Sequence, residues 1–175
     1  GGSLEVAGFA AAIYWIVKSI TVIPVGKFLD RNHGEKDDLW LMIIGNFLVA
    51  LSVFGYLISY RPWHIYLLQV ICAFGVSLNV PGYTAIFTRH INKGKEAFTW
   101  SARSSLMGIG IGASAAVGGI IANKFGFNLL FIIIGIFIIL SAFLPLFILN
   151  EMKPKDKKSV RTPEVKTMPL SGPKE

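Results

Sequence analysis

The sequence predicts an all-α polytopic membrane protein with five transmembrane helices. Four segments contain no Lys, Arg, Asp or Glu, namely residues 39–60, 62–88, 104–123 and 125–150, and a fifth, 6–26, contains only Lys18. A bilayer core of about 30 Å needs roughly 20 apolar residues in a helix, and in lipid each backbone polar group must bond within its own segment. We therefore expect helices over approximately 4–26, 39–60, 63–88, 98–123 and 127–149.

The composition agrees with a membrane protein and argues against nucleic-acid binding. Hydrophobic residues make up 53% of the chain, charged residues make up 15%, and the mean hydropathy is +0.59. Soluble domains average about 45–50% apolar and 25% charged residues. The net charge of +7 could suggest a nucleic-acid partner, but the Lys and Arg residues lie in connecting loops and a tail, without interleaved aromatic residues. The single cysteine, Cys72, is interpreted as a small buried hydrophobe.

The distribution of basic residues predicts the orientation. Thirteen Lys and Arg residues lie in the connections at 27–38 and 89–97 and in the tail, whereas the turns at 61–62 and 123–128 carry two. By the positive-inside rule the first set is expected to be cytoplasmic, with the C-terminus inside. We expect a multi-pass protein of the plasma (inner) membrane. The N-terminus then lies outside. Because the chain begins without Met, basic n-region or cleavage site, we expect Gly1 to be an interior point of a longer protein.

The first expected helix contains the candidate substrate-binding residue Lys18. It lies about 12 Å of helix rise from the expected helix end at Gly26. An unpaired ammonium at such a depth is costly, so it is expected to face a water-filled cavity or a carboxylate, with Trp15 and Tyr14 as aromatic walls. The alternative is that the side chain extends to the interface.

The first cytoplasmic connection carries the most specific motif. It includes Gly26, Asp30, Arg31, Gly34 and Lys36, with Asn32-His33 adding one residue before the second glycine. This pattern resembles the signature loop of the major facilitator superfamily, in which Gly is followed by an acid, a basic residue and a second Gly. The resemblance implies a loop that latches two helices during a conformational switch. A plain basic turn between two helices is the alternative.

The order of the spans extends the resemblance over residues 1–150. In this superfamily twelve helices form two halves, and the signature loop joins the second and third helix of each half. Five spans with the loop after the first resemble helices eight to twelve, a half bundle that lacks its first helix. The resemblance implies that helices eight, ten and eleven line the cavity, which adds Gln69, Asn79 and Tyr83 to the candidate substrate-binding residues.

The fourth and fifth segments and the tail have different expected roles. Helix-packing residues are expected on one face of the fourth span, at Gly108, Gly112, Ala115 and Gly119, where small side chains let helix backbones approach closely. Movement against the other half and ordinary tight packing both explain this face. The last span, with Ser141 as its only polar side chain between Leu129 and Leu149, is expected to face lipid. The tail, 151–175, is rich in Lys and Pro and is expected to be a disordered cytoplasmic segment that touches anionic lipid or a partner.

Together these patterns predict a secondary active or facilitative transporter that moves a small solute by alternating access. The expected partners are the solute, the lipid bilayer and the N-terminal half of the same transporter or a second chain. A self-contained five-span membrane protein with a structural or partner-binding role is the alternative. No catalytic constellation, metal-ligand spacing or phosphate-binding loop is present in the sequence, so we expect a protein that is not an enzyme and uses no cofactor or metal.

Overall fold

The computed structural model describes residues 3–32 and 34–151, and this part consists of helices joined by short connections. Its helices are α1 (Leu4–Asn32), α2 (Glu35–Gly55), α3 (Pro62–Arg89), α4 (Glu96–Phe125) and α5 (Phe127–Glu151), with a 3-10 turn, η1 (Tyr56–Ile58), after α2. All five α-helices are long and apolar enough to cross a membrane. The all-helical prediction is therefore confirmed. The expected tail lies outside the described residues apart from Glu151.

The first two helices extend beyond the ends expected from the charge pattern. The α1 helix continues through Gly26 to Asn32, and α2 begins at Glu35 instead of residue 39. Gly26 is thus an interior residue of α1 and not a helix end, because charged side chains at 27–32 are compatible with a helix outside the hydrocarbon core. Residues 27–38 are consequently mostly helical, whereas the sequence analysis treated them as a loop.

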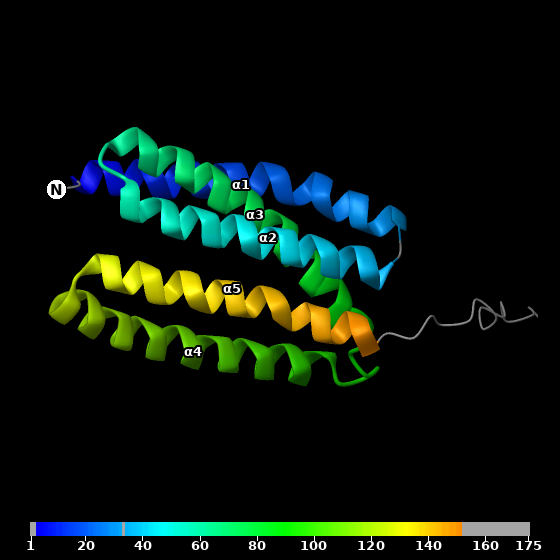
Figure 1. Cartoon of the computed structure of the whole chain (residues 1–175). Helices are drawn as coiled ribbons and strands as arrows, with labels where there is room; N and C mark the ends of the chain where they lie inside the picture. The colour runs from blue at the N-terminus through cyan, green and yellow to red at the C-terminus, as the bar shows by residue number, and fades with distance from the viewer. Residues whose placement is uncertain (1–2, 33, 152–175) are drawn as a thin grey trace, which may run out of the picture.

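The helices pack side by side in the spatial order α1, α3, α2, α5, α4, as Figure 1 shows. The central pair is α2 and α3, whose backbones approach closely at glycine residues. A Cβ atom on Gly45 would lie 2.5 Å from the carbonyl oxygen of Gly75, and one on Gly75 would lie 2.6 Å from that of Gly45. Small residues allow this contact where lipid supplies no hydrophobic drive for helix association.

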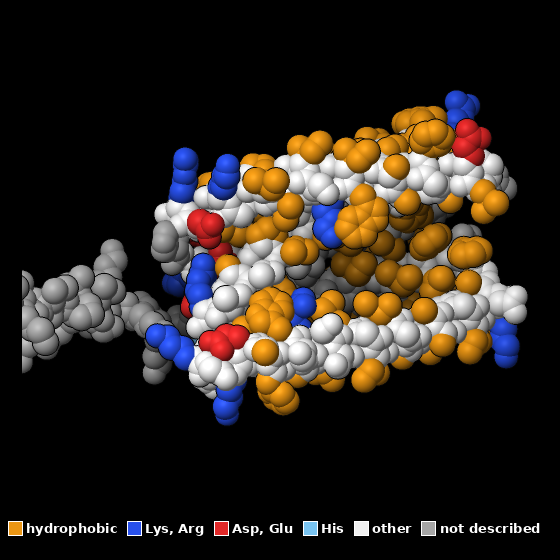
Figure 2. Space-filling model, turned by 180° about the vertical axis from the view of Figure 1, so that it is seen from behind, with side chains coloured by type: hydrophobic (Ala, Val, Ile, Leu, Met, Phe, Trp, Pro, Cys, Tyr) orange, Lys and Arg blue, Asp and Glu red, His pale blue; other side chains and the backbone are white. Residues whose placement is uncertain are grey.

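The outermost helices, α1 and α4, bound a hollow. Within the described part of the chain, no Cα atom of α1 lies within 8 Å of a Cα atom of α4. Figure 2 shows the corresponding face, hollowed between α1 above and α4 below and lined mainly by hydrophobic side chains. Acidic side chains on this face lie at the ends of the helices, whereas Lys and Arg side chains also lie inside the hollow.

The two ends of the bundle differ in their number of charged residues. Six of the described Lys and Arg residues lie at one end together with six Asp and Glu residues, and two lie at the other end together with one Glu. One end, called here the basic end, contains the α1–α2 and α3–α4 connections and the end of α5. The opposite end contains the start of α1, the η1 turn and Gly126, whose φ of +85° joins α4 to α5 in a one-residue turn. A glycine suits this position because other residues rarely adopt a positive φ.

Candidate functional site

Lys18 lies at the middle of α1, fourteen residues from either end of the helix. This corresponds to about 21 Å of helix rise in both directions. The distance from Lys18 to the helix end is larger than the 12 Å expected from sequence, because the helix continues past Gly26 to Asn32. Among the basic residues of the described helices, only Lys18 and Arg103 lie more than six residues from a helix end.

The Lys18 side chain folds back over its own helix. Its Nζ atom lies 4.5 Å from the ring centroid of Trp15 and 5.7 Å from that of Tyr14, and the two rings meet edge to face. Side chains of a helix lean toward its N-terminus. The ammonium therefore points away from the basic end, and its position does not fit a side chain that extends to that interface.

Ring contacts offset only part of the cost of placing Lys18 in the bilayer. Insertion scales assign roughly 2.5–3.5 kcal/mol to a lysine at a helix centre, whereas a cation–π contact is worth about 0.5–2 kcal/mol. Lys18 is half-buried, and the structure gives it no ion pair within the described residues. The remaining cost favours a wet or anionic environment for this ammonium.

Of the three polar residues singled out on α3, Gln69 and Tyr83 share a face. They are fourteen residues apart, close to four turns of helix. Asn79 has a different position, because its side-chain amide donates a 2.7 Å hydrogen bond to Asn46 on α2. The structure therefore places Asn79 in the α2–α3 interface. Ser77 faces α1, where its hydroxyl donates to the carbonyl oxygen of Lys18 at 3.3 Å.

Tyr83 belongs to a second cluster, centred on Arg103 of α4. The Arg103 Nε atom donates a 2.7 Å hydrogen bond to the Tyr83 hydroxyl. The guanidinium carbon also lies 4.9 Å from the ring centroid of Tyr83, 5.4 Å from that of Trp100 and 5.9 Å from that of Phe87. These side chains bridge α3 and α4, whose Cα atoms do not come within 8 Å of each other.

The sequence analysis missed this Arg103 cluster as a candidate site, although its spacing is visible in the sequence. Trp100 and Arg103 are three residues apart, and Tyr83 and Phe87 are four apart, so each pair lies on one helix face. The contact between the two pairs depends on the tertiary arrangement of α3 and α4.

The residues of the signature loop lie at the basic end. Asp30 and Arg31 are in the last turn of α1, Gly34 is the N-cap residue of α2 with extended backbone, and Lys36 follows in its first turn. Asp30 lines a cavity of about 400 Å³ together with residues of α3, including Thr88 and Arg89. The loop therefore adjoins the end of α3.

An ion pair joins α2 to α3 at this end. Arg89 Nη1 of α3 lies 2.5 Å from Asp38 Oδ2 of α2, and the Asp38 side chain is only 1% exposed. Its second oxygen, Oδ1, has no hydrogen-bond partner in the described part of the chain. The sequence analysis did not identify Asp38, which follows a run of charged residues typical of a solvated loop.

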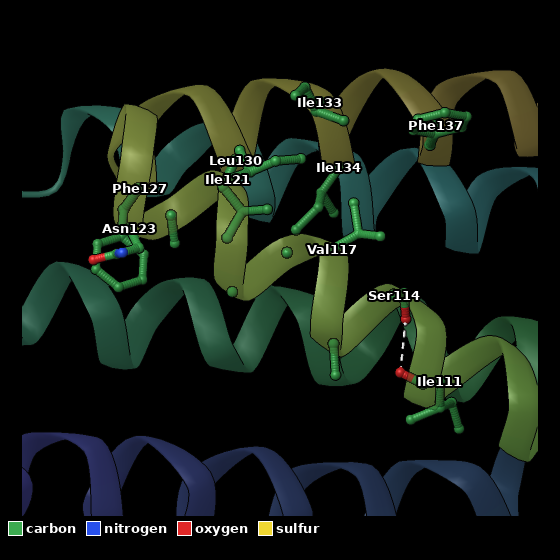
Figure 3. A pocket seen from close by; sticks show the side chains of 14 residues that line it. Ile111, Ser114, Val117, Ile121, Asn123, Phe127, Leu130, Ile133, Ile134 and Phe137 are labelled. Carbon is green, nitrogen blue, oxygen red and sulfur yellow. Dashed lines mark hydrogen bonds between the residues drawn. The ribbon is translucent and has the colours of Figure 1, made fainter.

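The small-residue face of α4 is open. Within the described residues, a Cβ on Gly108, Gly112 or Gly119 would meet nothing within 4 Å. Ala115 and Gly119 line an apolar groove of about 1090 Å³ between α4 and α5, in which Ile121 and Leu130 lie close together (Figure 3). The close glycine contacts of this chain are instead in the α2–α3 pair and at Gly135, which packs against Phe54.

Comparison with known proteins provides a family and one relative. A family model described as Major Facilitator Superfamily matches residues 1–173. The multi-drug resistance efflux pump PmrA homolog of Lactococcus lactis subsp. lactis (strain IL1403) is 24% identical over 151 residues, which cover 86% of this chain and 36% of the relative. The chain thus spans about a third of the relative's length. No solved structure matches the chain.

Proposed function

The chain belongs to the major facilitator superfamily, and on this premise we propose that it forms part of a transporter that moves a small solute by alternating access. The observation that carries the proposal is Lys18, a half-buried cation at the middle of a membrane-length helix beside a hollow. A structural five-span protein has no need of such a residue, whereas a solute path does.

In this proposal the chain supplies one wall of the path, and the other wall is the N-terminal half of the transporter or a second chain. The open hollow between α1 and α4 and the open small-residue face of α4 support a further partner. We propose that the basic end is cytoplasmic, so that the C-terminus lies on the inner side of the plasma membrane. The relative's description as an efflux pump favours export over import.

The signature loop is proposed as the conformational switch. Asp30 lies beside the end of α3, and the neighbouring Asp38–Arg89 pair fixes the start of α2 against α3. Rocking of this half against its partner would change the contacts of the signature loop at the basic end of the bundle. The residues of this chain hold and orient a solute, and no bond-making step is assigned to them.

Substitution of Lys18 by Ala in the full-length protein tests the proposal. We expect Lys18→Ala to reduce transport at least tenfold, because the solute loses its charged contact in the path, while the amount of protein in the membrane is unchanged. Transport is measured as solute flux across proteoliposomes. Lys27→Ala, at an exposed position near the end of the same helix, is the matched control and should transport normally. Normal flux in Lys18→Ala at normal expression would remove Lys18 from the path.

A further inference from the structure

Two positive centres, Lys18 and Arg103, are placed within the bundle without a carboxylate. The one ion pair of the described residues is formed by Asp38 and Arg89 at the basic end. The other acidic residues of this part lie at or near helix ends, and Figure 2 shows acidic side chains only at the ends of the hollowed face. The hollow of this half therefore carries positive charge that the described residues do not neutralise.

The two centres are held at different levels along α3. The backbone of Lys18 is bonded to Ser77, whereas the side chain of Arg103 is bonded to Tyr83. These two α3 residues are six positions apart, or about 9 Å of helix rise. Lys18 is presented from α1 and Arg103 from α4, the helices that bound the hollow.

Each cation is held beside aromatic rings and keeps donors available. Trp15, next to Lys18, is 60% exposed, so a large part of its ring is open to a ligand. Arg103 uses Nε for Tyr83, and the structure records no partner for its two Nη atoms among the described residues. A guanidinium with free Nη groups binds a carboxylate through two parallel hydrogen bonds, and exposed indole rings stack on planar aromatic bodies.

From this arrangement we infer that the transported solute is an organic anion, a planar aromatic body that carries a carboxylate. Lys18 binds the anionic group at the middle of the membrane, with the aromatic body against Trp15. Arg103, nearer the basic end, provides the second positive position on the path. The inference rests on the proposed function, since it assigns a substrate class to the same hollow.

Three probes with one ring system test the inference: 1-naphthoate as the anion, 1-naphthamide as the neutral isostere and 1-naphthylmethylammonium as the cation. Binding to the purified full-length protein is measured by titration calorimetry, and flux is measured separately in proteoliposomes. We expect naphthoate to bind at least tenfold more tightly than either other probe. We expect Lys18→Gln to weaken naphthoate binding about tenfold and naphthamide binding less than twofold. Arg103→Gln, at the second position, should weaken naphthoate binding less than Lys18→Gln does.

Two further variants separate charge recognition from a structural role. Lys18→Arg keeps the charge and should restore most of the naphthoate affinity, whereas Lys27→Gln, exposed near the end of α1, should change neither affinity. The inference is overturned if the cation or the amide binds as well as naphthoate, if none of the probes binds, or if the Gln variants weaken naphthoate and naphthamide equally. If a Gln variant fails to fold, the ranking of the three probes on the unmodified protein decides the question.

The two measurements distinguish failure of the inference from failure of the proposed function. Selective naphthoate binding without flux of any probe would contradict transport and leave the anion site standing. Flux of the cation, unaffected by Lys18→Gln, would leave transport standing and overturn the anion site.

Discussion

At the scale of single residues, the environment of a charge decides its role in this chain. Asp38 and Arg89 neutralise each other at the basic end, and Asp38 is almost completely buried, with its side chain 1% exposed. Lys18 and Arg103 are held by aromatic rings instead. The first pair is expected to stabilise the fold, whereas the second pair is left free to contact a solute.

Substitution of Arg89 should therefore affect stability. In Arg89→Gln the buried Asp38 loses its counter-charge, and breaking a buried pair typically costs about 3–5 kcal/mol. Because the Arg89 side chain is 34% exposed, we expect a smaller loss, about 2 kcal/mol. The measurement is thermal unfolding of the purified full-length protein, followed by tryptophan fluorescence.

The double variant Asp38→Asn/Arg89→Gln provides the internal check. It removes both charges, so it should recover part of the stability that Arg89→Gln loses. Arg61→Gln, an exposed residue before α3, serves as the charge-matched control and should unfold as the unmodified protein does. If the double variant is no more stable than Arg89→Gln, the stability lost in Arg89→Gln does not come from the unpaired charge of Asp38.

At the scale of helices, α2 and α3 form the most closely packed pair of the bundle. The close approach depends on two glycines, since a Cβ at either position would meet the backbone oxygen of the other helix. Backbone atoms cannot rotate away as the end of a side chain can. The pair must therefore separate to accept even one methyl group.

We expect Gly75→Ala to reduce the yield of folded protein severalfold, because overpacking at a backbone contact costs about 1–3 kcal/mol or more. The yield is measured as the monodisperse fraction after detergent extraction, by size-exclusion chromatography. Gly8→Ala in α1, where a Cβ would meet nothing within 4 Å in the described structure, is the matched control. Equal yields for the two variants would mean that the helices are not held this closely.

Helix number and approximate ends could be predicted from the sequence because charges mark where each apolar segment leaves the membrane. Which side of each helix packs against which neighbour could not be predicted. The α3 helix is apolar on nearly all sides, so nothing in its sequence distinguishes Asn79, which faces α2, from Tyr83, which reaches Arg103. The Asp38–Arg89 pair escaped prediction for the same reason, since it joins residues 51 positions apart.

At the scale of the whole molecule, the arrangement is an arc of five helices with a hollow between its outer members. The closely packed α2–α3 pair lies within the arc, and Lys18 and Arg103 belong to its outer helices, α1 and α4. In the proposed transporter this arc is one wall of the path and cannot enclose it alone. The account therefore requires the hollow to face an aqueous route that opens in turn to each side of the membrane.

Labelling of a single cysteine in the hollow from both sides of the membrane tests this requirement most directly. Val76 lies seven residues from both Gln69 and Tyr83 and so shares their face of α3. In a cysteine-free full-length protein, with Cys72 replaced by Ser, we expect Val76→Cys to react with an impermeant maleimide added on either side. Bound solute should raise the rate of labelling from one side of the membrane and lower the rate from the other side. Ile136→Cys, at an exposed apolar position of α5 that we expect to face lipid, is the control and should stay unreactive. Reaction of Val76→Cys from one side only, or from neither, would contradict alternating access.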